Sequence, residues 1–385
     1  MPDPTYKYGE RDVPDMSRRE LVPGQGRIAG YLAVLLGGMS VAGVLCFRYP
    51  TIFTTAELRA TYDVGMIRVL LWVCIWGALG FGMFNLARWM HRRKAAAGVA
   101  LSLAALALGG ASVEAGAVAP TKMSIGLDFL LISVLSSGAL YVVLEKLFPR
   151  YPGQVILRPG WRLDAGYFVV NHLLIGLFLF VGNSFAPAAF GWAVNARFQT
   201  FLQALPLPAQ VLIVLMAADF VQYWVHRAYH EVPVLWKLHA VHHSAEHLDW
   251  LAGSRTHLVQ VLIDRSLVMV PLYLLGPDKA ALDAYVVIAA IQAVGVHANL
   301  SWGFGPLKYL LVTPQFHHWH HSSDRPAIDT NYAVHLPLWD ALFGTYHMPD
   351  AHWPIAYGTV KPIPRTMAGQ FIYPFVPESE PTAPS

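Results

Sequence analysis

Long apolar runs without charged residues recur along the chain. The first of them, Ile28–Phe47, holds 20 residues between Arg27 and Arg48. A helix needs about 20 apolar residues to cross the hydrocarbon core of a bilayer. Runs of this kind occupy residues 28–47, 69–87, 95–113, 129–144, 165–182 and 201–218. The pattern therefore predicts six membrane spans.

Two further apolar runs flank Pro277–Asp283 and predict a helical hairpin. The first of these runs contains Asp264 and Arg265. Charged residues are costly inside a membrane unless they have partners, so we expect this hairpin to be short or re-entrant. Together the runs predict an all-α fold, a polytopic helix bundle in a membrane.

The composition agrees with a membrane protein and excludes several other classes. Charged residues make up 13% of the chain and hydrophobic residues 55%, whereas soluble domains carry about 25% charged residues. The net charge of +3, with no basic stretch interleaved with aromatic residues, argues against nucleic-acid binding. Only two cysteines, Cys46 and Cys74, are present, so a disulfide framework, a cysteine zinc site and an iron–sulfur cluster are excluded.

The Lys and Arg residues predict how the spans are oriented. If the N-terminus lies in the cytoplasm and the sides alternate, 21 of the 27 Lys and Arg residues fall in cytoplasmic segments. Cytoplasmic loops of membrane proteins carry such an excess. We therefore predict a multi-pass membrane protein whose N-terminus and histidine-rich segments face the cytoplasm.

The chain divides into three parts. Residues 1–125 form an N-terminal membrane unit of about three spans, which we expect to be accessory because its spans carry no polar chemistry. Residues 126–352 combine further spans with the histidine-rich segments and form the expected catalytic domain. Residues 353–385 are rich in proline and predict a C-terminal tail.

Histidines concentrate in one third of the chain. Fifteen of the 17 lie between His226 and His352. One cluster has the spacing H-x-x-x-H and two have the spacing H-x-x-H-H, and we expect each cluster to form one face of a helix. The clusters are His226 and His230; His239, His242 and His243; and His317, His320 and His321.

Eight imidazoles are too many for one metal ion but suit two first-row ions. Zinc hydrolases normally complete their sites with carboxylates or cysteine. A non-haem iron pair at a membrane surface, which activates dioxygen and attacks a C–H bond of a lipid, is the better match. The residues therefore favour a histidine-rich di-metal site at the cytoplasmic face. A membrane zinc metallohydrolase and a metal-transport or metal-binding protein remain alternatives.

The histidine clusters stand within longer motifs that resemble the fatty acid hydroxylase/sterol desaturase superfamily, integral-membrane di-iron oxygenases. The resemblance covers roughly residues 130–350. It rests on the stretches Asp219–Arg227, Leu235–Ser244, His297–Asn299, Thr313–Ser322, Asn331–Tyr332 and Leu338–Tyr346.

The resemblance implies functional roles for residues of these motifs. It implies further metal ligands at His297 and at His257, and a ligand or a supporting group at Asn299. Glu231 either orients the imidazole of His230 or is an interfacial carboxylate, and Asp219 is expected to support a ligand. The resemblance implies metal-ligand roles for His226, His230, His239, His242, His243, His317, His320 and His321.

The resemblance also implies the reaction. Two iron ions with O2 as co-substrate would hydroxylate or desaturate an unactivated C–H position of a lipid, sterol or alkyl chain. The sequence contains no haem-binding segment, dinucleotide fingerprint or thiolate cluster. A separate electron donor is therefore expected, which would be a reductase, a ferredoxin or a cytochrome.

Overall fold

A computed structural model describes residues 20–118, 124–349 and 352–377 of the protein. Within these residues every regular element is a helix. Extended segments pair only at two isolated bridges, Pro149 with Leu300 and Ser322 with Tyr357. The predicted all-α class is confirmed.

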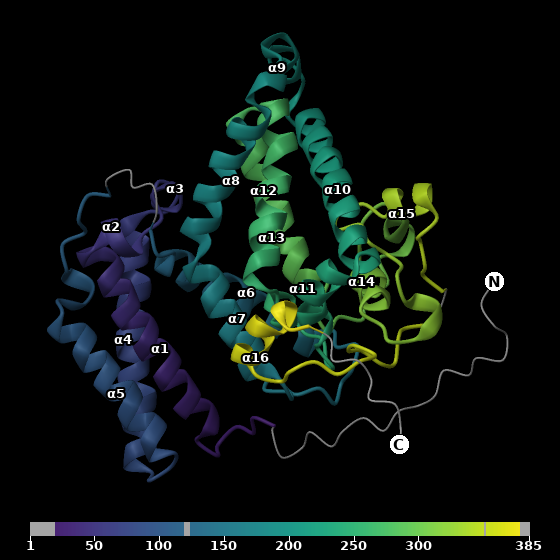
Figure 1. Ribbon diagram of the computed structural model, residues 1–385. Coiled ribbons are helices and arrows are strands. Elements are labelled where there is room, and N and C mark those ends of the chain that lie inside the picture. The colour runs from purple at the N-terminus through teal and green to yellow at the C-terminus, as the bar shows by residue number, and fades with distance from the viewer. Residues whose placement is uncertain (1–19, 119–123, 350–351, 378–385) are drawn as a thin grey trace.

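Three long helices of the N-terminal part pack against one another at one side of the molecule, shown in purple and blue (Figure 1). Gly98 permits the closest crossing, because a Cβ atom there would lie 2.6 Å from the Cβ of Ala33. These helices are α1 (Arg27–Arg48), α4 (Val64–Ala87) and α5 (Arg92–Ala107), with the short α2 (Pro50–Phe53) and α3 (Ala56–Arg59) between α1 and α4.

The N-terminal helices join the rest of the chain through α6 (Leu127–Leu147). The carboxylate of Asp128, at the start of α6, accepts hydrogen bonds from the backbone N–H of Thr55 at 3.1 Å and from its hydroxyl at 3.0 Å. Asp128 is buried. A buried carboxylate is costly without such partners, so this contact fixes the position of the α2–α3 connection on α6.

The remaining long helices stand together above the histidine-bearing elements (Figure 1). The side chains of Val214, Val268 and Tyr285 belong to the apolar core that joins α10, α12 and α13. The helices of this part are α7 (Trp161–Leu173), α8 (Ile175–Phe190), α9 (Ala196–Gln203), α10 (Leu207–Glu231), α11 (Pro233–His243), α12 (Leu258–Leu275), α13 (Lys279–Gly295), α14 (Pro314–His320), α15 (Leu338–Phe343) and α16 (Met367–Ile372).

Within the described residues, seven helical segments are long and apolar enough to cross a membrane, so the protein is a multi-pass membrane protein. The first four predicted spans correspond to four of them. The run at 165–182 is instead divided between α7 and α8, with the break at Leu174. The segments are Arg27–Arg48, Val64–Ala87, Arg92–Ser112, Leu127–Leu147, Ile175–Ala193, Leu207–Glu231 and Leu258–Leu275.

The predicted short or re-entrant hairpin is wrong in its first half. Helix α12 continues through Asp264 and Arg265 without a break. The carboxylate of Asp264 has hydrogen-bond partners. The hydroxyl of Tyr229 donates to it at 2.8 Å, and the side-chain amide of Gln260 donates to it at 3.3 Å. Satisfied hydrogen bonds allow the acid inside an apolar helix.

The C-terminal segment 352–377 packs against α7 and α11. Lys237 of α11 donates to the carbonyl of Val376 at 2.8 Å, and the Gln370 amide donates to the Ser244 hydroxyl at 3.2 Å. The ring of Phe371 meets Tyr167 of α7 edge-on. Residues of this segment thus contact α7, α11 and the residue that follows α11, and the rest of the predicted tail, residues 378–385, lies outside the described residues.

Candidate metal centre

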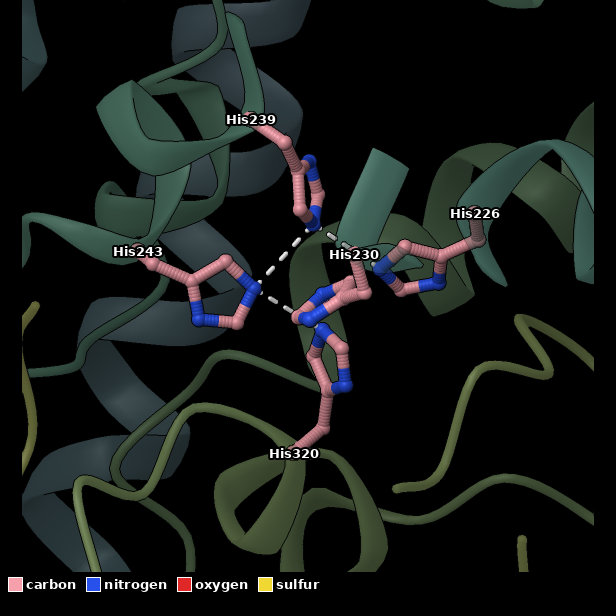
Figure 2. A group of neighbouring side chains, drawn as sticks. All are labelled: His226, His230, His239, His243 and His320. Carbon is pink, nitrogen blue, oxygen red and sulfur yellow. Dashed lines mark hydrogen bonds between the residues drawn. The ribbon is translucent and has the colours of Figure 1, made fainter. Parts of the chain in front are cut away.

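Five imidazoles converge on one point between α10, α11 and α14 (Figure 2). His226 and His230 lie in the last two turns of α10, His239 and His243 in α11, and His320 in α14. One nitrogen of each ring lies within 4.8 Å of those of the other four. We call these five residues group one.

The closest nitrogens of group one are all Nε2 atoms. The Nε2 of His239 lies 3.0 Å from that of His226 and 3.1 Å from that of His243. The Nε2 of His243 lies 3.0 Å from that of His320. The Nε2 of His230 is buried and has no hydrogen-bond partner within the described part of the chain. These ring nitrogens therefore face a common centre.

Four more imidazoles form a second point of convergence, which we call group two: His242, His297, His317 and His321. The Nε2 of His297 lies 3.1 Å from that of His242, 2.9 Å from that of His317 and 3.2 Å from that of His321. The groups adjoin, because the ring of His321 stacks on His243 with centroids 4.5 Å apart. The two groups therefore lie side by side in one cluster of nine imidazoles.

Each H-x-x-H-H motif contributes to both groups. His239 and His243 of α11 belong to group one, whereas His242 belongs to group two. In the second such motif the assignment is reversed: His317 and His321 belong to group two, and His320 to group one. Each motif therefore presents one helix face to both of the adjoining groups. A helix turns by about 100° per residue, so the middle histidine of each motif points in a different direction from the last one and reaches the other group.

Outer hydrogen bonds determine which nitrogen of several rings carries a proton. The Nδ1 of His226 lies 2.7 Å from the carbonyl of Tyr332, and the Nδ1 of His320 lies 2.8 Å from the carbonyl of Thr330. A carbonyl oxygen only accepts, so each Nδ1 is the donor. The Nε2 of a neutral ring then carries an unshared electron pair that points at the centre.

The same reasoning applies to group two. The Nδ1 of His242 donates to the carbonyl of Arg255 at 3.1 Å, and the Nδ1 of His297 donates to that of Ala293 at 2.8 Å. The two Nε2 atoms, 3.1 Å apart, consequently face each other with no proton between them. Two unshared electron pairs in this position repel unless a cation lies between them.

Burial keeps these rings neutral. Removal from water, together with the neighbouring imidazoles, lowers the pKa of six of these histidines well below the usual value: His239, His242, His243, His317, His320 and His321. Burial lowers the pKa of His297 to about 4. Neutral imidazole is the form that binds metal ions.

The donor set fits two first-row metal ions. Imidazole nitrogens bind such ions at about 2.1 Å, and two ligands at a right angle are then about 3.0 Å apart. The Nε2 separations of 3.0 Å for His226 and His239 and of 3.1 Å for His242 and His297 match this value. Both groups consist of histidines alone among the described residues. All-nitrogen sets suit iron, copper and zinc.

The structure does not bring His257 into either group. Its Nδ1 accepts a hydrogen bond from the backbone N–H of Val259 at 3.2 Å and so caps α12. Its Nε2 donates to the carbonyl of Phe371 at 3.2 Å. Both ring nitrogens have partners in the fold, so we leave His257 out of the ligand set.

The other three predicted site residues contact backbone or a neighbouring side chain and not the imidazoles. Asp219 accepts hydrogen bonds from three consecutive N–H groups of the chain at 334–336. Asn299 exchanges two hydrogen bonds with the backbone of Tyr151. Glu231 pairs with Arg227 at 2.7 Å. The expected orientation of His230 by Glu231 is therefore not present.

The residue that contacts His230 is one that the sequence reasoning missed. The carboxylate of Asp329 accepts from its Nδ1 at 3.1 Å. Gln260 is a second omission, since its side-chain oxygen accepts from the Nδ1 of His239 at 3.2 Å. Asp329 stands two residues before the Asn331–Tyr332 pair of the family-like motifs. This closeness was the signal in the sequence that could have pointed to Asp329. The contact itself depends on backbone conformation and is not visible in a spacing.

His318 lies between two members of its cluster but outside both groups. Its Nε2 donates to the carbonyl of His297 at 3.3 Å, and its Nδ1 accepts from the hydroxyl of Tyr357 at 2.9 Å. The His318 ring therefore contacts the backbone of His297 and is not a member of either group.

Comparison with known proteins agrees with this arrangement. The family model described as fatty acid hydroxylase matches residues 211–345, which contain all nine converging histidines. An ornithine lipid hydroxylase of Rhizobium tropici is 36% identical over 248 residues, which cover 63% of this chain and 74% of that protein. No solved structure matches the chain.

Other relatives share a shorter region. The alkylglycerol monooxygenase of Homo sapiens is 32% identical over 148 residues, 38% of this chain and 32% of that protein. A very-long-chain aldehyde decarbonylase of Oryza sativa subsp. indica is 29% identical over 240 residues, 57% of this chain and 36% of that protein. The chain thus spans about a third of the length of these two relatives. It belongs to the fatty acid hydroxylase family, and the predicted oxidoreductase class is confirmed.

Proposed function

We propose that this member of the fatty acid hydroxylase family is a di-iron monooxygenase that converts a C–H bond of a membrane lipid into C–OH. The observation that carries the proposal is the pair of converging all-histidine groups, with unprotonated Nε2 atoms about 3 Å apart. Zinc hydrolases complete their sites with carboxylate or thiolate ligands, and neither group contains one among the described residues. This donor set supports iron over the zinc alternative.

Each group would hold one iron ion. Group one offers His226, His230, His239, His243 and His320, and group two offers His242, His297, His317 and His321. Bound iron would supply the activation of O2 and the oxidation of the C–H bond. The balanced reaction is R–H + O2 + 2 e− + 2 H+ → R–OH + H2O.

The protein's own residues bind and orient the ligands and exclude water. The carbonyls of Tyr332, Thr330, Arg255 and Ala293 fix four of the rings through their Nδ1 atoms. Eight of the nine histidines are buried, and His230 is partly exposed. Dry surroundings with fixed dipoles strengthen electrostatic interactions at a reacting centre.

The substrate class follows from the membrane and from the relatives. The described helices leave large apolar side chains exposed along membrane-spanning segments, where a lipid chain is the solvent. Two of the relatives are named as an ornithine lipid hydroxylase and an alkylglycerol monooxygenase. We infer a polar membrane lipid as substrate, oxidised on the cytoplasmic side, with electrons from a separate reductase, ferredoxin or cytochrome.

Lipid mass spectrometry of host membranes tests the proposal. Cells that express the protein should contain a lipid with one additional oxygen, and cells that express His320→Ala should not. Glu231→Gln is the matched control, because Glu231 follows the proposed ligand His230 in the chain and its carboxylate pairs with Arg227. A product that lacks two hydrogens would indicate desaturation. A product one carbon shorter would indicate decarbonylation and would overturn the proposal.

Metal analysis separates the proposal from its rivals. The purified protein should contain about two iron ions per chain and consume O2 when it is supplied with electrons and lipid. Zinc retained in stoichiometric amount, with activity but without O2 consumption, would support a metallohydrolase. Transport sites lie near the bilayer midplane, whereas these groups lie at the ends of helices. Metal flux across vesicles with no lipid product would nevertheless support a transporter.

A further inference from the structure

Three of the five rings of group one are held by a single short stretch of chain, residues 329–332. The carboxylate of Asp329 accepts from His230, the carbonyl of Thr330 from His320, and the carbonyl of Tyr332 from His226. These rings come from α10 and α14, two helices that lie far apart in the sequence. The stretch therefore ties together ligands that no single helix aligns.

The backbone of this stretch is held in an uncommon conformation. Asp329 has φ +59° and Asn331 has φ +61°, in the left-handed region that non-glycine residues rarely adopt. Asn and Asp adopt this region more readily than other side chains. Such a conformation persists only where surrounding contacts enforce it, and it gathers at functional sites.

The side chain of Asn331 enforces it from inside the protein. Asn331 is fully buried. Its amide donates to the carbonyls of Phe316 at 3.0 Å and of His347 at 2.6 Å, and its oxygen accepts from the N–H of His347 at 2.7 Å. Its backbone N–H donates to the carbonyl of Thr345 at 2.9 Å. Hydrogen bonds from both its side chain and its backbone thereby fix Asn331 in place.

Two buried carboxylates hold the residues that follow. Asp340 of α15 accepts from the N–H groups of Tyr332 at 2.7 Å and Ala333 at 2.8 Å. Asp219 of α10 accepts from the next three N–H groups, of Val334, His335 and Leu336, at 2.7 to 2.9 Å. A carboxylate that accepts several backbone N–H bonds makes strong, charge-assisted contacts. The stretch is thus braced against both α10 and α15.

No single stretch of the described chain holds several rings of group two in this way. Its outer acceptors are two separate backbone carbonyls, of Arg255 and Ala293. The Nδ1 atoms of His317 and His321 are buried without a hydrogen-bond partner among the described residues. Within the described chain, residues 329–332 form hydrogen bonds with rings of group one and with no ring of group two.

We propose that residues 329–332 are a positioning clamp for the group-one metal, in which Asp329 orients His230 and Asn331 holds the clamp in shape. The proposal rests on the ligand groups of the proposed function. It predicts that the two metal positions can be uncoupled, so that damage to the clamp weakens binding at group one and leaves group two intact.

Metal titration of the purified full-length protein tests this directly. Apo protein is titrated with Co2+, whose absorption reports ligand geometry, and the bound metal is counted by mass spectrometry. Loss of an outer partner of a metal ligand typically lowers metal affinity about 10- to 100-fold. Asp329→Ala should therefore weaken one of two binding events by that factor and change its absorption bands. Asp329→Asn, which keeps an accepting oxygen, should restore most of the affinity.

Glu231→Ala is the matched control, because it removes an exposed carboxylate next to the same ligand, His230, without touching a ring. It should leave both binding events unchanged. Equal weakening by Asp329→Ala and Glu231→Ala would show a general charge effect and overturn the clamp. Equal weakening of both events by Asp329→Ala would also overturn it.

Asn331→Gly tests the second half of the proposal. Glycine keeps the left-handed conformation accessible but removes the three side-chain hydrogen bonds. The variant should weaken the group-one event while the thermal midpoint of the apo protein shows whether the fold survives. A folded variant with two unchanged binding events would overturn the role of Asn331. If the wild-type protein binds fewer than two metal ions, the proposed function fails, independently of the clamp.

Discussion

The two histidine groups use the same ligand chemistry but are supported differently. In group one, four of five rings donate their Nδ1 proton to a partner, and three of these partners lie within residues 329–332. In group two, His242 and His297 are the only rings with such partners among the residues that the structure describes. His317 and His321 are held by contacts with other rings.

The difference also extends to the surrounding charges. The carbonyl that accepts from His242 belongs to Arg255, whose guanidinium pairs with the buried Asp164 at 2.5 Å. Asp164 and Asp249 both pair with the fully buried Arg158. Group two is thus supported by an ion-pair network around one backbone carbonyl, whereas group one is supported by a loop. Equal ligand chemistry does not imply equal rigidity.

Removal of one ligand from each group gives the largest expected effect. His320→Ala should lower iron bound at group one, and His242→Ala should lower iron bound at group two, since each loses an Nε2 donor. Turnover should fall more than about 100-fold in both variants, because the reaction needs both ions. Iron analysis and lipid product analysis measure this. Full activity in either variant would remove that residue from the site.

His242→Ala should remove the ion of group two more completely than His320→Ala removes the ion of group one. His242→Ala leaves three imidazoles in group two, whereas His320→Ala leaves four in group one. A result in which both variants lose both ions to the same extent would mean that the groups do not bind independently.

Asp219→Asn should have the next largest effect and should act on group one. The carboxylate accepts three backbone N–H bonds, and an amide offers one acceptor oxygen and two donors in its place. We expect a loss of about 2 kcal/mol or more in stability. Thermal unfolding with and without metal measures it. An unchanged midpoint would show that this anchor does not hold the segment 334–336.

His257→Ala should have a smaller effect and leave both groups filled. The ring caps α12 through the N–H of Val259, and loss of a helix cap costs about 1 kcal/mol. The expected result is a slightly lower thermal midpoint with about two iron ions retained per chain. Loss of an ion from either group would reinstate His257 as a ligand.

Deletion of residues 1–125 should change the metal centre least. No member of either group comes from the described part of this segment, residues 20–118 and 124–125. Iron content of the remaining protein should stay near normal if the unit is accessory. Loss of metal would show that α1, α4 and α5 help to build the site, for example through the contact of Thr55 with Asp128.

Much of the candidate site could be predicted from the sequence because helical spacing is local. The pairs His226 and His230, His239 and His243, and His317 and His321 each lie four residues apart and each share a group. His297 also joined the cluster as the resemblance implied. Asp329 could not be predicted, because its contact with His230 depends on a left-handed backbone in a loop nearly 100 residues away.

Periodicity and residue type alone determined that this chain forms apolar helices and presents imidazoles at their ends, since both depend on neighbours a few positions apart. Only the packing of α10, α11 and α14 decided how those rings divide, with His242 and His320 each separated from the rest of their motif. The reason is geometric. Spacing states which side of one helix a ring occupies, whereas a metal position exists only where several helices cross.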